Sequence, residues 1–410
     1  MDDITNETFY SKFHFTRKFM ELTGWTPGAY LRKRRLEEAA KDILAGSDIL
    51  QVAVDYHFGS QQAFTRSFKA YFRTTPGFYR DMRVLPVEKG EPTMIKELEN
   101  LRGKNKWTTH LGCLGGCLDY LKRGVSDAWL FGATGHAFIL NIPDGVQASG
   151  PTAWDTQKML SLVSNLGGKI KTISQWKHQT KDFAKVQEEA WNLVRQSIDA
   201  GNPCYSFGFV IHDYFVIYGY DDTGYYYSGP GCDRDTGSVP WQELGDNDVP
   251  WIDLHAVSPV PVADDTKTVK DALEFALEFS KYPNKWLWES CKSGLVGYDS
   301  WIQSLADGKA NTYGVSYNTV VWLECRELGV QFLREASRRL GGAAVKPLEE
   351  AAEHYETVSR QLRALTKLYP MPGGLVEDKE LRKKAVTLLR NARDAEAYGL
   401  ASLEKVVSAL

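Results

Sequence analysis

The sequence predicts an α+β protein with an all-helical N-terminal domain, a central mixed domain and a helical C-terminal region. Three patterns support this prediction. Residues 11–30 and 60–79 repeat each other, with apolar residues at helical spacing. Residues 202–231 contain alternating segments typical of paired strands. Beyond residue 263, long apolar stripes at three-four spacing predict helices. The predicted boundaries are 1–84, a linker over 85–107, 108–262 and 263–410.

The composition is that of an ordinary folded protein. The 410 residues are 43% hydrophobic and 25% charged, with a net charge of −3, which excludes an intrinsically disordered chain. No apolar run approaches 18 residues, so we expect no membrane span, and the acidic first 25 residues predict no secretory signal. Six cysteines without a CxxC pair predict neither a disulfide framework nor a zinc site. We therefore expect a cytoplasmic protein with no metal and no cofactor.

Charge is distributed unevenly along the chain. Residues 9–83 hold thirteen Lys or Arg and seven Asp or Glu, a local net charge of +6 on an otherwise acidic protein. A basic end of this kind is typical of a nucleic-acid-binding module. The charge also fits a solvated basic helix, because Arg32 to Arg35 alone contribute four positive charges. Charge does not separate these two interpretations.

The repeat favours the first interpretation. The two copies share nine of twenty residues, and each begins with Ser, a helix-capping residue, and ends with Thr-Pro-Gly. Between them, residues 27–44 predict a helix with a basic face. Ahead of the second copy, Ile49, Val52 and Ala53 predict a short helix, Phe58-Gly59 a turn, and Ser60 the cap of the next helix. This order is typical of a helix-turn-helix unit, and two such units can enter successive major-groove turns of double-stranded DNA.

The N-terminal segment resembles the DNA-binding domain of the AraC/XylS family of transcription regulators. The resemblance covers about residues 2–83, and VAVDYHFGSQQAFTRSFKAYFRTTPGFYR follows the family signature nearly throughout. The first half is most similar to the Rob/MarA-like branch. Family members usually have another helix before the first helix-turn-helix. We therefore expect either a trimmed start or a minimal version of the domain here.

The resemblance implies which residues contact DNA. The positions that touch bases in the family are Phe13, Thr16, Arg17, Gln61, Gln62 and Arg66. Gln pairs bidentately with adenine and Arg with guanine. Alternatively, the repeated Thr-Arg pairs bind phosphate or cap helices. We expect Arg34 to bind phosphate, if it contacts DNA. The phenylalanines that recur at helical spacing are expected in the core: Phe15, Phe64, Phe68 and Phe72.

The central domain is expected to begin with a helix near Cys113, followed by a strand over 138–140. Phe207, Phe209 and Ile211 predict one strand, Phe215, Ile217 and Gly219 another, and residues 221–224 a turn. About residues 108–260 resemble a papain-like domain, most closely that of butirosin-biosynthesis protein H, an acyltransferase relative. Such enzymes place a cysteine nucleophile on a helix and a histidine base on a distant strand.

The resemblance puts Cys113 in the nucleophile's place but leaves the other catalytic positions altered. Asp213 occupies the position of the base, His212 lies one residue away, and Gly229 replaces the aspartate of the Asp-Pro pair. We therefore expect a cleft without catalysis, and Cys117 as a core residue. The alternative is a DNA-tethered acyltransferase or cysteine hydrolase that uses Cys113, with His136 substituting as its base.

The C-terminal region is expected to be helical over 267–281, 318–340, 347–368 and 379–410. The stripe from Leu348 to Leu365 predicts packing in the core, or alternatively a dimer seam. Aromatic residues gather in this region and could line a pocket for a drug-sized ligand, with Glu324 facing a cation. The alternative is that most of them fill the core. The candidate ligand-binding residues are Trp286, Trp288, Trp301, Tyr313, Trp322 and Glu324.

Together these features predict a ligand-responsive transcription regulator that is not an enzyme. Its body would bind a small-molecule effector, with an aromatic or cationic antibiotic as one candidate class, and would change DNA affinity or the contact with RNA polymerase. A constitutive regulator whose body binds only a protein partner is a further alternative. Either a monomer or a homodimer is compatible with the sequence, which names neither the operator, the effector nor the sign of regulation.

Overall fold

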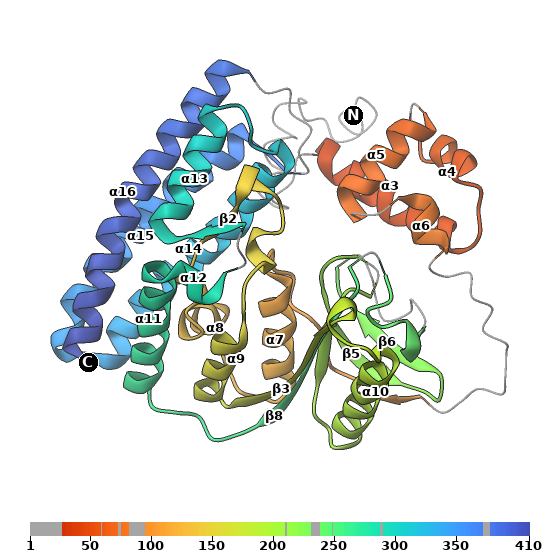
Figure 1. The fold of residues 1–410 in the computed structure, drawn as a ribbon, viewed down its shortest axis with the longest axis horizontal. Coiled ribbons are helices and arrows are strands. Elements are labelled where there is room, and N and C mark those ends of the chain that lie inside the picture. The colour runs from red at the N-terminus through yellow and green to blue at the C-terminus, as the bar shows by residue number, and fades with distance from the viewer. Residues whose placement is uncertain are drawn as a thin grey trace, which may run out of the picture. The chain divides into compact units, whose positions relative to one another are not determined.

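Figure 1 shows the fold of the protein in a computed structural model. The structure describes residues 27–58, 60–72, 75–81, 95–209, 211–230, 238–247, 249–287, 290–371 and 378–410. The chain divides into two compact units, and the described residues up to Asp81 belong to the first. The second unit, called the body below, comprises Thr93–Phe209 and Asp213–Leu410. The central region and the C-terminal helices are therefore parts of one unit.

The N-terminal unit is helical throughout its described residues. Its helices are α3 (Pro27–Leu44), α4 (Ile49–Asp55), α5 (Gln61–Phe72) and α6 (Pro76–Asp81). The helix predicted over 27–44 is confirmed with the same bounds. Phe64 and Phe68 are fully buried and Phe72 nearly so, with the rings of Phe68 and Phe72 4.4 Å apart. Their predicted core role is confirmed, whereas Phe15 lies outside the described residues.

The body contains an antiparallel sheet whose strands follow the order β3-β8-β4-β5-β6-β7, with β1 paired to β5. The strands are β1 (Lys96–Glu97), β3 (Gly168–Trp176), β4 (Cys204–Phe207), β5 (Tyr214–Tyr220), β6 (Gly224–Ser228), β7 (Ser238–Pro240) and β8 (Trp251–Pro259). The predicted turn over 221–224 is confirmed, since the Asp221 carboxylate accepts the N–H groups of Thr223 and Gly224. The strand predicted through residue 211 ends earlier, at Phe207, because Gly208 turns the chain at a φ of +83°.

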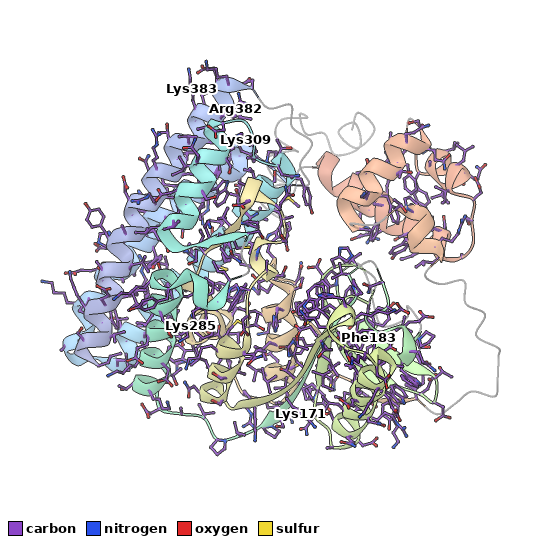
Figure 2. The ribbon with its side chains drawn as sticks, in the orientation of Figure 1. Lys171, Phe183, Lys285, Lys309, Arg382 and Lys383 are labelled. Carbon is purple, nitrogen blue, oxygen red and sulfur yellow. The ribbon has the colours of Figure 1, made fainter. Side chains whose placement is uncertain are left out.

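Helices make up the rest of the body. The first group, which covers the sheet or connects its strands, is α7 (Thr109–Tyr120), α8 (Asp127–Ala133), α9 (Gln157–Leu162) and α10 (Phe183–Asp199). The C-terminal group is α11 (Asp265–Lys281), α12 (Pro283–Trp286), α13 (Gly294–Ala306), α14 (Thr312–Leu340), α15 (Val345–Leu368) and α16 (Lys379–Ala409). The four predicted C-terminal helices are confirmed, α14 starting six residues earlier than predicted. Side chains fill the space between these helices, and Lys171 points outward from the edge strand β3 (Figure 2). No helix in the described ranges is long and apolar enough to cross a membrane.

A buried arginine joins the helices to the central region. Arg326 on α14 is fully buried and forms a bidentate ion pair with Glu396 on α16, at 2.8 and 3.0 Å. Its Nη1 also donates to the carbonyl oxygens of Ala137 and Ile139. The strand predicted over 138–140 is wrong: the Ile139 carbonyl binds the Arg326 side chain, and strand pairing begins only at Asn141. The chain instead forms a short 3-10 helix, His136–Phe138, followed by β2 (Asn141–Pro143), which pairs with β9 (Cys291–Ser293).

Candidate nucleic-acid interface and the cavity of the body

Helices α4 and α5 form the second of the two predicted helix-turn-helix units. Asp48 caps α4 by accepting the N–H groups of Leu50 and Gln51, at 2.9 and 3.1 Å. Ser60 caps α5 through the N–H of Ala63, as predicted. Between the helices, His57 adopts a positive φ of 59°, an uncommon conformation that reverses the chain. These local features place the start of α5 at the end of a tight turn.

A polar contact holds α4 against the connecting helix α3. Tyr56, at the end of α4, donates its hydroxyl hydrogen bond to Asp42 over 2.7 Å. Partial burial and this hydrogen bond raise the pKa of Tyr56 to about 12, so the phenol stays protonated. Val52 and Ala53 supply the buried face of α4. This hydrogen bond and the buried apolar face both hold α4 in the unit.

The predicted DNA-contacting residues fall into two groups. Gln61 and Gln62 are exposed in the first turn of α5, where side chains of a recognition helix reach base edges. Arg34 is exposed on α3 and forms ion pairs with Glu37 and Glu38, at 3.1 and 3.2 Å. Arg66 belongs to α5, but its side chain is outside the described part of the structure. The remaining candidates also lie outside the described residues: Phe13, Thr16 and Arg17.

In the body, helix α7 begins at Thr109, four residues earlier than the predicted start at Cys113. The Thr108 N–H donates to Glu324 on α14 over 3.2 Å, so a carboxylate occupies the helix N-terminus. Burial raises the pKa of Glu324 to about 7, against the lowering effect of the Thr108 hydrogen bond. The sequence predicted Glu324 as a ligand contact. In the structure, its carboxyl group accepts a hydrogen bond from the backbone at the start of α7.

The position of Cys113 does not suit a nucleophile. It lies in the second turn of α7 and is 3% exposed, so the dipole at the helix start does not act on it directly. Burial and the charge of Asp213 raise the pKa of the thiol well above its ordinary value. Cys117 is fully buried and the prediction that it is a core residue is confirmed. The placement of Cys113 at the helix start is thus corrected.

Thr109 occupies the helix start in place of a thiol. Its hydroxyl donates to Asp213 over 3.0 Å and accepts the N–H of Tyr214 over 3.1 Å. Asp213 is buried, whereas its neighbour His212 is exposed. His136, the predicted substitute base, lies beside Cys325, with Nδ1 3.5 Å from Sγ. Burial lowers the pKa of His136 to about 3 and raises that of Cys325 to about 12, so neither forms a charged pair at neutral pH.

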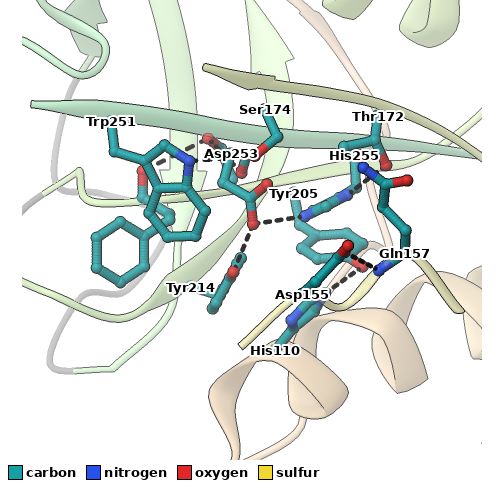
Figure 3. A network of polar contacts seen from close by, with 12 residues as sticks. His110, Asp155, Gln157, Thr172, Ser174, Tyr205, Tyr214, Trp251, Asp253 and His255 are labelled. Atoms are coloured by element: carbon teal, nitrogen blue, oxygen red, sulfur yellow. Dashed lines mark hydrogen bonds and ion pairs between the residues drawn. The ribbon is translucent and has the colours of Figure 1, made fainter. Parts of the chain in front are cut away.

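A buried polar network extends from α7 across the sheet (Figure 3). His110 bonds the Tyr205 hydroxyl at 3.0 Å, and His255 links Asp253 at 3.0 Å to Thr172 at 2.9 Å. Burial raises the pKa of Asp253, but its interactions with His255, His110 and Tyr214 outweigh burial, and the pKa lies below the ordinary value. Burial also lowers the pKa of His110 well below its usual range. Sequence reasoning missed this network, whose members come from segments up to 145 residues apart.

A small cavity lies beside this network at the start of α7. Its lining includes Trp107, His110, His136, Trp154 and Tyr317. The cavity volume is about 20 Å³, which is roughly the room that one water molecule needs. The cavity is therefore small and has both polar and aromatic residues in its lining. No sequence pattern pointed to this set of residues.

None of the five predicted ligand-binding residues that the structure describes lines this cavity. Trp301 is fully buried on α13, and Trp286 packs edge-on against Phe275 at 5.5 Å. Trp322 stacks on His136 at 6.1 Å, and Tyr313 stacks on Tyr317 at 6.3 Å, both behind cavity walls. Trp288 lies outside the described residues. Two of the predicted residues, Trp322 and Tyr313, thus contact rings that line the cavity. Among the described residues, no cluster of His, Cys, Asp or Glu is placed to hold a metal ion.

Comparisons with known proteins bear on the N-terminal unit. Residues 4–82 match the family model of a helix-turn-helix domain. The probable transcription factor PqrA of Proteus vulgaris is 46% identical over 87 residues, which are 21% of this chain and 71% of PqrA. The transposon Tn10 TetD protein of Escherichia coli is 43% identical over 22% of this chain and 64% of its own length. The right origin-binding protein of Escherichia coli K12 is 44% identical over 20% of this chain and 28% of its own length. These matches each cover about a fifth of the chain.

Proposed function

Since this chain belongs to the AraC family of DNA-binding transcription regulators, we propose that it is an effector-responsive member of that family. The observation that supports DNA recognition is the capped α4-turn-α5 unit, which exposes Gln61 and Gln62 at the start of its second helix. In this proposal the family's base-contacting positions carry over to this chain, including Arg17 and Arg66. Arg34 binds phosphate after leaving its glutamate partners.

The body is proposed to sense a small molecule without converting it. The buried, high-pKa thiol of Cys113 and the Thr109–Asp213 pair at the helix start both oppose nucleophilic catalysis. Ligand binding would change the population of DNA-binding states, so the effector must have different affinities for those states. The output is a changed DNA affinity or a changed contact with RNA polymerase. The matches reported above do not extend over the body, so this part of the proposal rests on its own residues.

The DNA half of the proposal is tested by selecting sites for the full-length protein from a random duplex library. We expect an enriched sequence with two half-sites about one helical turn apart. Binding to the selected site should exceed binding to random duplex by at least about a thousandfold at physiological salt. A library that shows no enrichment would contradict sequence-specific recognition.

The sensor half is tested by screening small molecules for a change in thermal unfolding of the full-length protein, because a ligand that binds the folded state raises its stability. Positive compounds are then tested for a shift in affinity for the selected DNA site. A compound that stabilises the protein, shifts DNA affinity and is recovered unchanged supports a sensor. Turnover of the compound, abolished by Cys113→Ala in a folded protein, would favour an enzyme instead.

A further inference from the structure

We propose that a groove between α8 and α14 is the effector site of the body and that it binds a drug-sized organic acid through its carboxylate. This inference rests on the proposed sensor function and adds a location and a ligand class to it. The groove has a volume of about 640 Å³, which lies in the range of sites that hold drug-sized ligands. None of the described residues that the sequence predicted as ligand contacts lines it.

The two helices that form the groove are packed closely against each other. Ala128 on α8 and Leu328 on α14 supply the apolar residues of the lining, and they are 6% and 9% exposed. The same helices meet through Trp129 and Phe332, whose ring centroids lie 5.1 Å apart. A Cβ at Gly132 would lie 1.9 Å from the Phe332 ring. This packing fixes the spacing of α8 and α14, so the groove is formed before a ligand arrives.

The carboxylates of the lining already have cationic partners. Asp127 accepts Lys104 and Lys106, at 2.9 and 2.5 Å. Glu335 forms an ion pair with Arg339 on the same helix. A cationic ligand would therefore have to displace a cation of the protein from either carboxylate. The cation that the sequence suggested as an effector class is disfavoured in this groove.

The uncommitted polar side chains of the lining are Arg338 and Gln331. Both are exposed on α14, and no hydrogen bond or ion pair joins either to another of the residues that the structure describes. Arg334, one turn before Arg338, is instead paired with Glu356 at 2.8 Å. Gln331 lies two turns before Arg338, so the two side chains share a helix face. The groove thus presents one unpaired positive charge beside an amide.

An unpaired guanidinium selects a carboxylate. Its planar fork matches the two oxygens of a carboxylate with two parallel hydrogen bonds. A single unpaired cation balances one negative charge, whereas a phosphate group brings nearly two. The amide of Gln331 can donate to a second acceptor on the ligand. The apolar part of the ligand then covers Ala128 and Leu328, which removes apolar surface from water.

The groove also borders the segment through which the chain enters the body. Lys106 belongs to the lining, and the described residues of the body begin shortly before it, at Ile95. The Lys104 N–H donates to the Gly112 carbonyl on α7 over 2.9 Å, and a Cβ at Gly112 would lie 2.5 Å from the Lys104 carbonyl oxygen. A carboxylate in the groove competes with Asp127 for Lys106. The ligand therefore acts on a tightly packed segment that follows the DNA-binding unit in the chain.

The test measures binding of three probes of similar size to the full-length protein by calorimetry: 2-naphthoate, 2-naphthamide and 2-naphthylmethylamine. A flat ring suits the groove because guanidinium groups also stack on aromatic faces. The wild type should bind 2-naphthoate about tenfold more tightly than either other probe, since only the carboxylate forms a charge-assisted pair with Arg338.

Two substitutions of Arg338 test the location, and both leave the fold intact because the side chain is exposed. Arg338→Gln should weaken 2-naphthoate binding about tenfold by removing the charge. Arg338→Glu should reverse the preference, so that the amine binds more tightly than the acid. Arg390→Gln is the matched control, because Arg390 on α16 is also exposed, has no partner among the described residues and lies outside the lining. This variant should bind 2-naphthoate normally.

Several results would overturn the inference. Equal or tighter binding of the amine to the wild type would refute the anionic class. Binding of 2-naphthoate that both Arg338 variants retain would refute the groove as the site while leaving the sensor function intact. Binding that depends on Arg338 but leaves the affinity for the selected DNA site unchanged would count against the sensor function and leave the site standing. Absence of binding by all three probes at millimolar concentration would refute the ligand class, and the compound screen then decides separately whether the body senses anything.

Discussion

Thr109 Oγ1 donates a 3.0 Å hydrogen bond to Asp213 Oδ1, joining the first turn of α7 to the start of β5. A papain-like enzyme needs a thiol and an imidazole at such a junction. Here a hydroxyl and a carboxylate are locked to each other, and the hydroxyl also accepts the Tyr214 N–H. The Thr109 hydroxyl and the Asp213 carboxylate therefore both take part in holding α7 to β5. Neither group of this pair is therefore placed as a nucleophile or as its base.

Substitutions in the DNA-binding unit should separate base contacts from phosphate contacts. Arg17→Ala or Gln61→Ala is expected to cost about 1–3 kcal/mol in binding to the selected site and to relax preference at one base pair. Arg34→Ala should weaken binding to selected and random DNA alike, if Arg34 reaches phosphate. Competition titrations at fixed salt measure both affinities. An unchanged ratio of specific to random affinity in the first two variants would show that these residues do not read bases.

Removing half of the buried ion pair should destabilise the body strongly. Arg326→Met leaves Glu396 buried at 1% exposure without its cation, which we expect to cost about 3–5 kcal/mol. The double variant Arg326→Met with Glu396→Leu should recover much of that loss. The exposed pair of Arg393 and Asp299 provides the control, and Arg393→Met should cost less than about 1 kcal/mol. Denaturant unfolding measures each value, and equal costs for Arg326→Met and Arg393→Met would contradict the prediction.

The stability contributed by Glu324 should depend on pH. Burial raises its pKa to about 7 in the folded protein from an ordinary 4.5. The folded state therefore binds more protons between these values, and stability falls as pH rises through this window. Glu324→Gln removes the titrating carboxyl group, so the variant does not lose this stability. Between pH 5 and pH 8 its free energy of unfolding should rise by about 2 kcal/mol relative to that of the wild type. Parallel thermal melts across this range test it, and a constant difference between the two proteins would count against it.

The close contact between α7 and the segment before it depends on a glycine. A Cβ at Gly116 would lie 1.9 Å from the carbonyl oxygen of Arg102, a backbone atom that cannot move aside easily. Gly116→Ala should therefore destabilise the body by several kcal/mol, as overpacking of a core does. Gly103→Ala is the neighbouring control, since its Cβ would meet only side chains at 3.8 Å. The two variants are compared by urea unfolding, and similar midpoints would refute the contact.

The thiol of Cys113 should be inert. It is buried and its pKa is raised well above the ordinary value, so little thiolate forms at neutral pH. We expect Cys113→Ala to retain DNA binding and the response to an effector. Peptide mapping after brief treatment with a maleimide should find Cys113 unmodified in the native protein and modified after unfolding. Rapid stoichiometric labelling of native Cys113 would instead support an enzyme.

Features encoded over a few residues could be predicted from the sequence. The helix over 27–44, the Ser60 cap, the buried phenylalanines of α5 and the four C-terminal helices follow from local periodicity and capping. Within the strand expected over 138–140, the Ile139 carbonyl instead binds Arg326, a residue 187 positions away. Local pattern carries no information about such a partner.

The cavity required the packed structure. Its walls combine Trp107, His136, Trp154 and Tyr317, which span 210 residues of chain and share no motif. The aromatic residues that the sequence grouped by proximity, such as Trp301 and Trp322, point into the core because the helices bury those faces. Hydrophobic burial favours an inward aromatic ring whatever its neighbours in sequence. Sequence could thus identify a DNA-reading domain, whose signals are local, whereas the position of the cavity depends on how distant helices and strands pack together.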